Sequence, residues 1–162
     1  MTTKLMTKGP GRRYRVATKD EVMEAAAAYI VEGVVKSGEP MTSPRLAAEV
    51  FGRVLKDLEY EQFVVAFLDS RHRLIACVPM FRGTVDGASV HPREVVKAAL
   101  AYNAAAVVLA HNHPSGVSEP SRADETITTR LRDALALVDI RVVDHLVIGR
   151  DSTVSLAERG LI

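Results

Sequence analysis

Short apolar runs of strand length alternate with helical patterns in the second half of the chain. The runs at residues 63–68, 104–110 and 141–148 are mostly apolar and rich in branched side chains, which is typical of buried strands. Between them, apolar side chains recur every three or four positions, which predicts helices that begin near His91 and Arg122. Strands that alternate with helices along a chain favour an α/β domain, in which helices pack against a central sheet.

Two further strands are expected in this sheet. Residues 73–81 follow the first apolar run after a polar turn at residues 69–72, so these two runs should pair as a hairpin. Residues 153–156 form a shorter candidate strand near the C-terminal end of the sequence.

The first third of the chain is organised differently. Apolar residues recur at helical spacing over residues 20–36, a Ser-Gly-Glu-Pro segment breaks the pattern, and a second helix is expected from Pro44 with Ser43 as its N-cap. We therefore predict a small helical N-terminal extension over residues 20–58, packed as an accessory element on the α/β domain of residues 59–162.

Residues 1–19 form a basic arm. They contain six of the 21 basic residues and none of the 20 acidic ones, which leaves 15 basic and 20 acidic side chains for the rest of the chain. Such an arm is able to contact nucleic acid. Its Gly-Pro-Gly segment at residues 9–11 instead favours a flexible, solvated tail. The body shows no basic stripe, which argues against a dedicated nucleic-acid-binding fold.

The composition of the chain also indicates where in the cell the protein is expected. No apolar run approaches the roughly 20 residues of a membrane span, and the basic N-terminal stretch lacks the apolar core of a secretory signal. The single cysteine, Cys77, excludes a disulfide framework within the chain and lies in an apolar stretch, which predicts a buried structural thiol. We expect a soluble, cytoplasmic protein that makes no contact with a membrane.

Two histidines leave the end of a predicted strand and are followed by a turn and a carboxylate. His111 and His113 are two positions apart, so in extended chain their rings point to the same side. Pro-Ser-Gly at residues 114–116 reverses the chain, and a helix that begins near Ser121 places Asp124 in its first turn. Two histidines and one carboxylate suit a zinc ion that keeps a fourth position for water.

Simpler interpretations exist for each of these residues. Ser121 and Asp124 have the spacing of a capping box at the start of a helix, and a cap of this kind is compatible with metal binding. A single histidine at a strand end is usually only a polar end residue. Two histidines, a turn and a carboxylate together favour a metal site.

The spacing of these residues resembles a known signature. His111-x-His113, then seven residues, Ser121, two residues and Asp124 is similar to the JAMM/MPN metalloprotease motif. The wider sequence resembles the RadC family within that superfamily, over residues 58–160. The resemblance implies a deaminase-like layered MPN (JAB) domain, a mixed sheet flanked by helices, with one zinc ion per chain held by His111, His113 and Asp124. The segments that carry the RadC resemblance are His-Asn-His-Pro-Ser-Gly at 111–116, Pro-Ser-x-x-Asp at 120–124, Gly83-Thr84, His91-Pro92-Arg93-Glu94, Asn103-Ala104-Ala105 and Asp144-His145.

The same resemblance implies two further site residues. Glu61, at the start of the first core strand, would hydrogen-bond the zinc-bound water, act as general base and pass the proton to the leaving amine. Ser121 would stabilise the oxyanion of the tetrahedral intermediate. Glu59 is the main competitor for the role of base, because it lies two residues away and can share a face of the strand. Without the resemblance, a glutamate at a strand start is most often a solvated edge residue.

These observations predict a zinc-dependent amide or isopeptide hydrolase, with a peptide or isopeptide as substrate. The alternative is a DNA-repair-associated accessory or binding module that uses the zinc domain as a scaffold. Residues 1–58 show no Gly-x-Gly hairpin between paired helices, so the chain is similar to short RadC members found on prophages and other mobile elements. The pair Asp144 and His145 fits a buried structural element better than a cleft lining, and pairing of edge strands would allow a homodimer.

Overall fold

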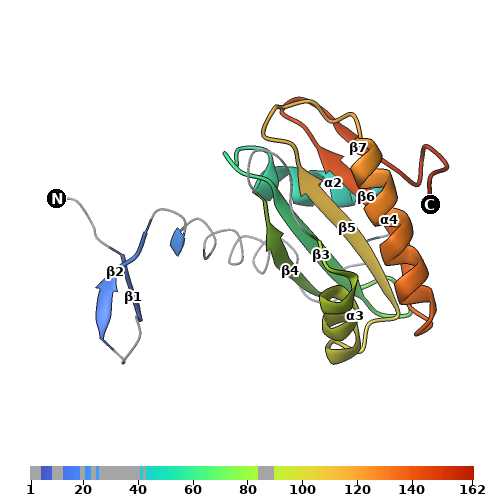
Figure 1. The fold of residues 1–162 in the computed structure, drawn as a ribbon, viewed down its shortest axis with the longest axis horizontal. Helices are drawn as coiled ribbons and strands as arrows, with labels where there is room; N and C mark the ends of the chain where they lie inside the picture. The colour runs from blue at the N-terminus through green and yellow to red at the C-terminus, as the bar shows by residue number, and fades with distance from the viewer. Residues whose placement is uncertain are drawn as a thin grey trace.

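The architecture is visible in a computed structural model of the chain (Figure 1). The helix predicted over residues 20–36 falls almost wholly outside the described residues, as does Thr84. The structure describes residues 5–8, 13–18, 21–22, 25, 41, 43–83 and 90–162.

A five-stranded mixed sheet forms the centre of the fold, in the order β4-β3-β5-β6-β7 (Figure 1). Only β5 and β6 are parallel, and the other neighbouring strands pair antiparallel. All five strands were predicted from the sequence, and β3 and β4 form the expected hairpin. The strands are β3 (Gln62–Leu68), β4 (Leu74–Arg82), β5 (Ala106–Asn112), β6 (Arg141–Ile148) and β7 (Thr153–Ser155).

Three described helices pack on this sheet: α2 (Pro44–Leu55), α3 (Pro92–Ala101) and α4 (Arg122–Ala136). Their starts follow from local sequence. In α2 the side chain of Ser43 accepts a hydrogen bond from the backbone N–H of Leu46 at 3.2 Å, which confirms the predicted cap. In α3 a proline occupies the first position, where its missing N–H costs nothing.

The helices cover both faces of the sheet, with α2 on one face and α3 and α4 on the other (Figure 1). Alternate residues of a strand point to opposite faces. In β3, Val64 and Ala66 therefore join the core under α2, whereas Phe63 and Val65 join the core under α3 and α4. Because Phe51 and Leu55 of α2 are fully buried in the first of these cores, α2 is an integral part of the domain and forms the helical layer on that face of the sheet.

The connection from β5 through α4 to β6 positions the candidate site. The chain leaves the C-terminal end of β5, passes through a loop at residues 113–121 and enters α4, which returns it to the parallel strand β6. The end of β5 and the first turn of α4 are thereby brought together, since only this short loop separates them.

The predicted basic arm contains a short hairpin, β1 (Met6–Lys8) and β2 (Tyr14–Val16), paired antiparallel. Within β2, Arg15 forms a two-pronged ion pair with Glu21, which lowers the pKa of Glu21 to about 2. Composition did not predict these strands. Among the described residues, no helix is both long and apolar enough to cross a membrane.

Cys77 lies in β4, where it is partly buried against the core under α2. Burial raises the pKa of its thiol to about 12, so the thiol stays protonated at neutral pH. Its environment agrees with the structural role that the sequence predicted.

Replacing Phe51 with alanine should lower the free energy of unfolding by roughly 3–5 kcal/mol, because the fully buried ring would leave a cavity between α2 and the sheet. Leu137→Ala serves as the control: that side chain is 86 % exposed, and its loss should cost less than about 0.5 kcal/mol. Urea unfolding measures both values. Equal midpoints for the two variants would show that α2 is not part of the cooperative core.

Candidate metal centre

The two histidines of the predicted site lie at the end of β5. His111 belongs to the strand and points to the face covered by α3 and α4, and His113 follows one residue after its end. The backbone N–H of His113 donates to the carbonyl of Ile148 at 2.9 Å, which keeps the chain extended beyond Asn112. The Nε2 atoms of the two rings are 3.0 Å apart, so the rings converge as their spacing predicted.

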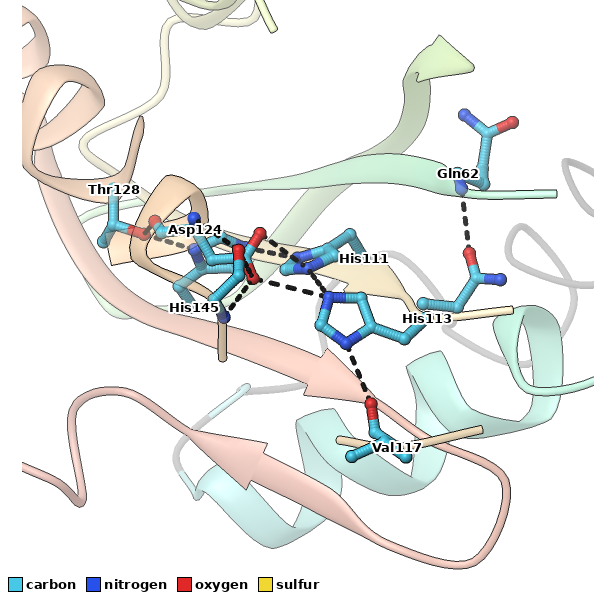
Figure 2. A network of polar contacts seen from close by, with 9 residues as sticks. Gln62, His111, His113, Val117, Asp124, Thr128 and His145 are labelled. Atoms are coloured by element: carbon cyan, nitrogen blue, oxygen red, sulfur yellow. Dashed lines mark hydrogen bonds and ion pairs between the residues drawn. The ribbon is translucent and has the colours of Figure 1, made fainter. Parts of the chain in front are cut away.

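Asp124 completes the cluster from the first turn of α4 (Figure 2). Its Oδ1 lies 3.1 Å from Nε2 of His111, and its Oδ2 lies 3.4 Å from Nε2 of His113. His111 and Asp124 are buried and His113 is partly exposed, so the cluster is open to solvent on one side. One ligand atom from each of the three residues lies within 4.8 Å of the others, an arrangement that could hold a metal ion.

Ser121 holds the carboxylate of Asp124 in place. Its backbone N–H and its hydroxyl both donate to Oδ2 of Asp124 at 2.6 Å, and its Oγ accepts from the backbone N–H of Asp124 at 3.2 Å. This is the capping box that the sequence predicted. The positive end of the α4 dipole also favours a carboxylate in the first turn.

The loop after β5 orients the ring of His113. The Nδ1 of His113 donates to the carbonyl of Val117 at 2.8 Å. Gly116 has a φ of 85°, which favours glycine, and its carbonyl accepts from Arg150 at 2.9 Å. Gly149 packs directly under the loop, where an added Cβ would lie only 2.6 Å from the Gly116 oxygen. The loop conformation therefore depends on glycine at both positions.

The cluster fits a metal ion in its chemistry. A carbonyl oxygen can only accept, so His113 must carry a proton on Nδ1, and in the neutral ring the lone pair on Nε2 faces Asp124. The carboxylate offers further lone pairs at the same point. Two imidazole nitrogens and one carboxylate oxygen are the ligand set of many catalytic zinc sites. Facing acceptors repel one another unless a cation or protons lie between them.

Electrostatics within the cluster agree with this picture. Burial alone would raise the pKa of Asp124, but the contacts of its carboxylate with His111 and then with His113 outweigh this effect and hold that pKa far below the usual range. The hydrogen bond to Asp124 raises the pKa of His113 above its ordinary 6.5, and the charge of Glu61 adds to the effect. The carboxylate is thus ionised, and the site favours positive charge.

Glu61 lies next to this cluster. Glu61 directly precedes β3, whose Phe63 pairs with His111 of β5. Its side chain is half-buried, and its charge acts on His113. Glu59, the competing candidate, is exposed.

Asn112 fixes the backbone on both sides of Glu61, which sequence reasoning missed. Its Oδ1 accepts from the backbone N–H of Gln62 at 2.8 Å, and its Nδ2 donates to the carbonyl of Tyr60 at 2.9 Å. The carbonyl of Glu61 itself accepts from Gly83 at 2.8 Å. The signal in the sequence was the residue between the two histidines, whose side chain must point to the opposite face of the strand.

Asp144 and His145 are both buried in β6. The carboxylate of Asp144 accepts hydrogen bonds from the backbone N–H groups of His145 and Ala157 and from the hydroxyl of Ser155, at 2.7–3.1 Å. It ties β6 to β7, which is the structural role expected of it. His145 contacts His111 directly, with 2.8 Å between Nε2 of His145 and Nδ1 of His111, and this contact was not predicted.

The fold and the cluster together define a JAB-type α/β domain with a candidate metal site. A family profile described as "RadC-like JAB domain" matches residues 41–161. The relatives of this chain include UPF0758 proteins from three bacteria. That of Thioalkalivibrio sulfidiphilus is 57 % identical over 148 residues, 91 % of this chain and 66 % of the relative. That of Nitrosococcus oceani is 58 % identical over 132 residues, 82 % of this chain and 59 % of the relative. That of Leptothrix cholodnii is 52 % identical over 154 residues, 95 % of this chain and 68 % of the relative.

The chain therefore belongs to the RadC family, as the sequence motifs predicted. It spans slightly less than two thirds of the length of the first two relatives, 66 % and 59 %. The matched residues begin at 41 and so include α2, in agreement with its place in the core.

The metal-free protein should be most stable near pH 6.5. The raised pKa of His113 contributes stability that is complete below about 6.5 and is lost as pH rises through the folded-state value. Burial lowers the pKa of His145, so its contribution is present above about 6.5 and is lost as pH falls.

Urea unfolding of chelator-treated protein between pH 5 and 9 measures this dependence, and His113→Gln is the control. The variant should lose the decline above about pH 6.5 and keep the decline below it. A variant that retains the alkaline decline would show that His113 is not its source.

Proposed function

We propose that this chain is a zinc-dependent hydrolase of amide bonds, in peptides or isopeptides, with one zinc ion held by His111, His113 and Asp124. The observation that carries the proposal is the convergence of two imidazole nitrogens and a carboxylate on one point. Membership of the RadC family, with its JAB domain, supports it.

Three protein ligands leave a fourth zinc position for water, which is the usual difference between a catalytic and a structural site. A zinc ion bound in this way polarises a substrate carbonyl and lowers the pKa of its water to about 7. His113 is partly exposed and His111 is buried, so a substrate would approach the metal site from the side of His113.

Glu61 is proposed as the general base. The clamp from Asn112 on the residues before and after it restricts where its carboxylate can lie, and its charge already acts on His113. From this position it would take a proton from the attacking water and deliver it to the leaving amine. Glu61 is preferred to Glu59 because it lies beside the cluster and is partly shielded from solvent.

Ser121 is proposed to donate a hydrogen bond to the oxyanion that develops on the substrate carbonyl. Its hydroxyl has a single proton, which in this structure is donated to Oδ2 of Asp124. The backbone N–H of Ser121 donates to the same oxygen at 2.6 Å. Asp124 would therefore stay oriented when the hydroxyl turns toward a substrate.

The alternative is an accessory role in DNA repair, with the domain as a scaffold, and it rests on the association of the RadC family with DNA repair and on the charge of residues 1–19. Three of the six basic residues there belong to the described part of the chain, and one of these, Arg15, is already paired with Glu21. We favour the hydrolase because a scaffold requires neither an open ligand position nor a carboxylate held beside it.

Metal content tests the ligand set. Purified wild-type protein should contain about one zinc ion per chain, and His113→Ala and Asp124→Ala should contain almost none, because a two-ligand remnant binds zinc weakly. The matched control is Asp133→Ala, which removes an exposed carboxylate from the same helix and should keep the metal. Mass spectrometry of the metal measures all four proteins, and a wild type that refuses zinc under metal-replete conditions would contradict the proposal.

The role of Glu61 is tested separately from metal binding. Glu61→Gln should retain zinc and lose roughly 10²- to 10⁴-fold in the rate of hydrolysis, because the base is removed and the ligands stay. Glu59→Gln is the matched control and should keep the wild-type rate. Both are measured on the peptide or isopeptide substrate found by screening the wild type. Loss of activity in Glu59→Gln alone would assign the role of base to Glu59. Full activity in both variants would show that neither glutamate is the base.

A further inference from the structure

A buried chain of hydrogen bonds runs from α4 through β6 to β5 and ends on His111 (Figure 2). The hydroxyl of Thr128 contacts the backbone carbonyl of Asp124 and Nδ1 of His145, each at 2.5 Å. Nε2 of His145 lies 2.8 Å from Nδ1 of His111. We infer that Thr128 and His145 are positioning residues that fix the tautomer of His111, so that its Nε2 lone pair faces the metal position. The role of these residues in zinc binding rests on the proposed function.

The direction of the chain follows from the chemistry of its first bond. A backbone carbonyl can only accept, so Thr128 must donate its one hydroxyl proton to Asp124. Thr128 therefore accepts from His145, which places a proton on Nδ1 of that ring. The hydrogen bond with Thr128 therefore fixes the tautomer of His145.

The proton on Nδ1 of His145 also decides the direction of the next hydrogen bond, between His145 and His111. His145 is 0 % exposed, and its two ring nitrogens contact a hydroxyl and another imidazole, not a carboxylate that would balance a charge. A neutral ring is favoured in such a place. With its proton on Nδ1, His145 offers a lone pair at Nε2, and His111 must donate to it from Nδ1. The lone pair of His111 is then left on Nε2, 3.1 Å from Asp124.

His113 has the same tautomer, with its proton on Nδ1 and its lone pair on Nε2, and a single hydrogen bond sets it. Its Nδ1 donates directly to the carbonyl of Val117, a group that cannot donate in return. His111 instead meets another histidine, and a histidine can accept or donate at either nitrogen. Thr128 removes that ambiguity, because its proton is already committed to Asp124. The series of hydrogen bonds thus connects the backbone carbonyl of one proposed metal ligand, Asp124, to the ring of another, His111.

The test compares Thr128→Val with Thr128→Ser. Valine keeps the shape of the side chain and removes the hydroxyl, which frees His145 to turn its proton to Nε2 and so forces a proton onto Nε2 of His111. Zinc affinity, measured by competition with a chelator, should fall roughly 10- to 100-fold in Thr128→Val. Thr128→Ser retains the hydroxyl and should bind zinc within a few-fold of wild type. Equal affinities in the two variants would overturn the inference.

A second readout reports the tautomers themselves. Long-range ¹H–¹⁵N correlation spectra of wild-type protein, with and without zinc, should show a proton on Nδ1 of both His111 and His145 in either state. A proton on Nε2 of His145 would overturn the inference, even if Thr128→Val failed to fold. The spectrum without zinc also separates the two proposals: wild-type protein that shows these tautomers but takes no zinc would refute the hydrolase and leave the positioning chain intact.

Discussion

The pairing of β5 between β3 and β6 decides where the candidate site residues lie. β5 is the central strand of the sheet, and both of its neighbours fix its register through backbone hydrogen bonds. That register turns His111 toward α4 and Asn112 toward the opposite face, where it holds the chain around Glu61. It also sets His145 diagonally across from His111 on the parallel strand, within reach of its Nδ1.

The first turn of α4 serves stability and chemistry with the same atoms. The carboxylate of Asp124 accepts from the backbone N–H of Ser121 at the start of the helix, and it also faces the two imidazoles. Caps of this type contribute about 1 kcal/mol to helix stability, so selection for the fold and selection for the site favour the same residue. The helix dipole, the cap and the histidines all stabilise the ionised form of Asp124, which is the form that binds cations.

Much of the fold was predictable because buried strands have continuous apolar sequence and helices have their own period. The candidate site was predictable because its ligands are local: His111 and His113 share a face by strand geometry, and Asp124 follows after one turn and a cap. The contact between His111 and His145 was not predictable in this way. It depends on how β5 and β6 are aligned, because the two histidines are 34 residues apart along the chain and no local pattern encodes that alignment. The β1–β2 hairpin was missed because glycine and proline suit a flexible tail as well as a turn.

The alternation of side chains along β5 also makes a bound cation sensitive to folding errors. A slip of one residue in this strand would turn Asn112 toward α4 and carry His111 to the face under α2. Such a misaligned sheet could still bury apolar residues, since β5 is apolar on both faces, but it would have no ligand set. A cation at the centre would therefore stabilise only the correctly aligned chain, by about 2.7 kcal/mol when its free concentration is about a hundred times its dissociation constant. Metal binding in this domain would then favour the correct register of β5, which the apolar sequence of the strand specifies only weakly.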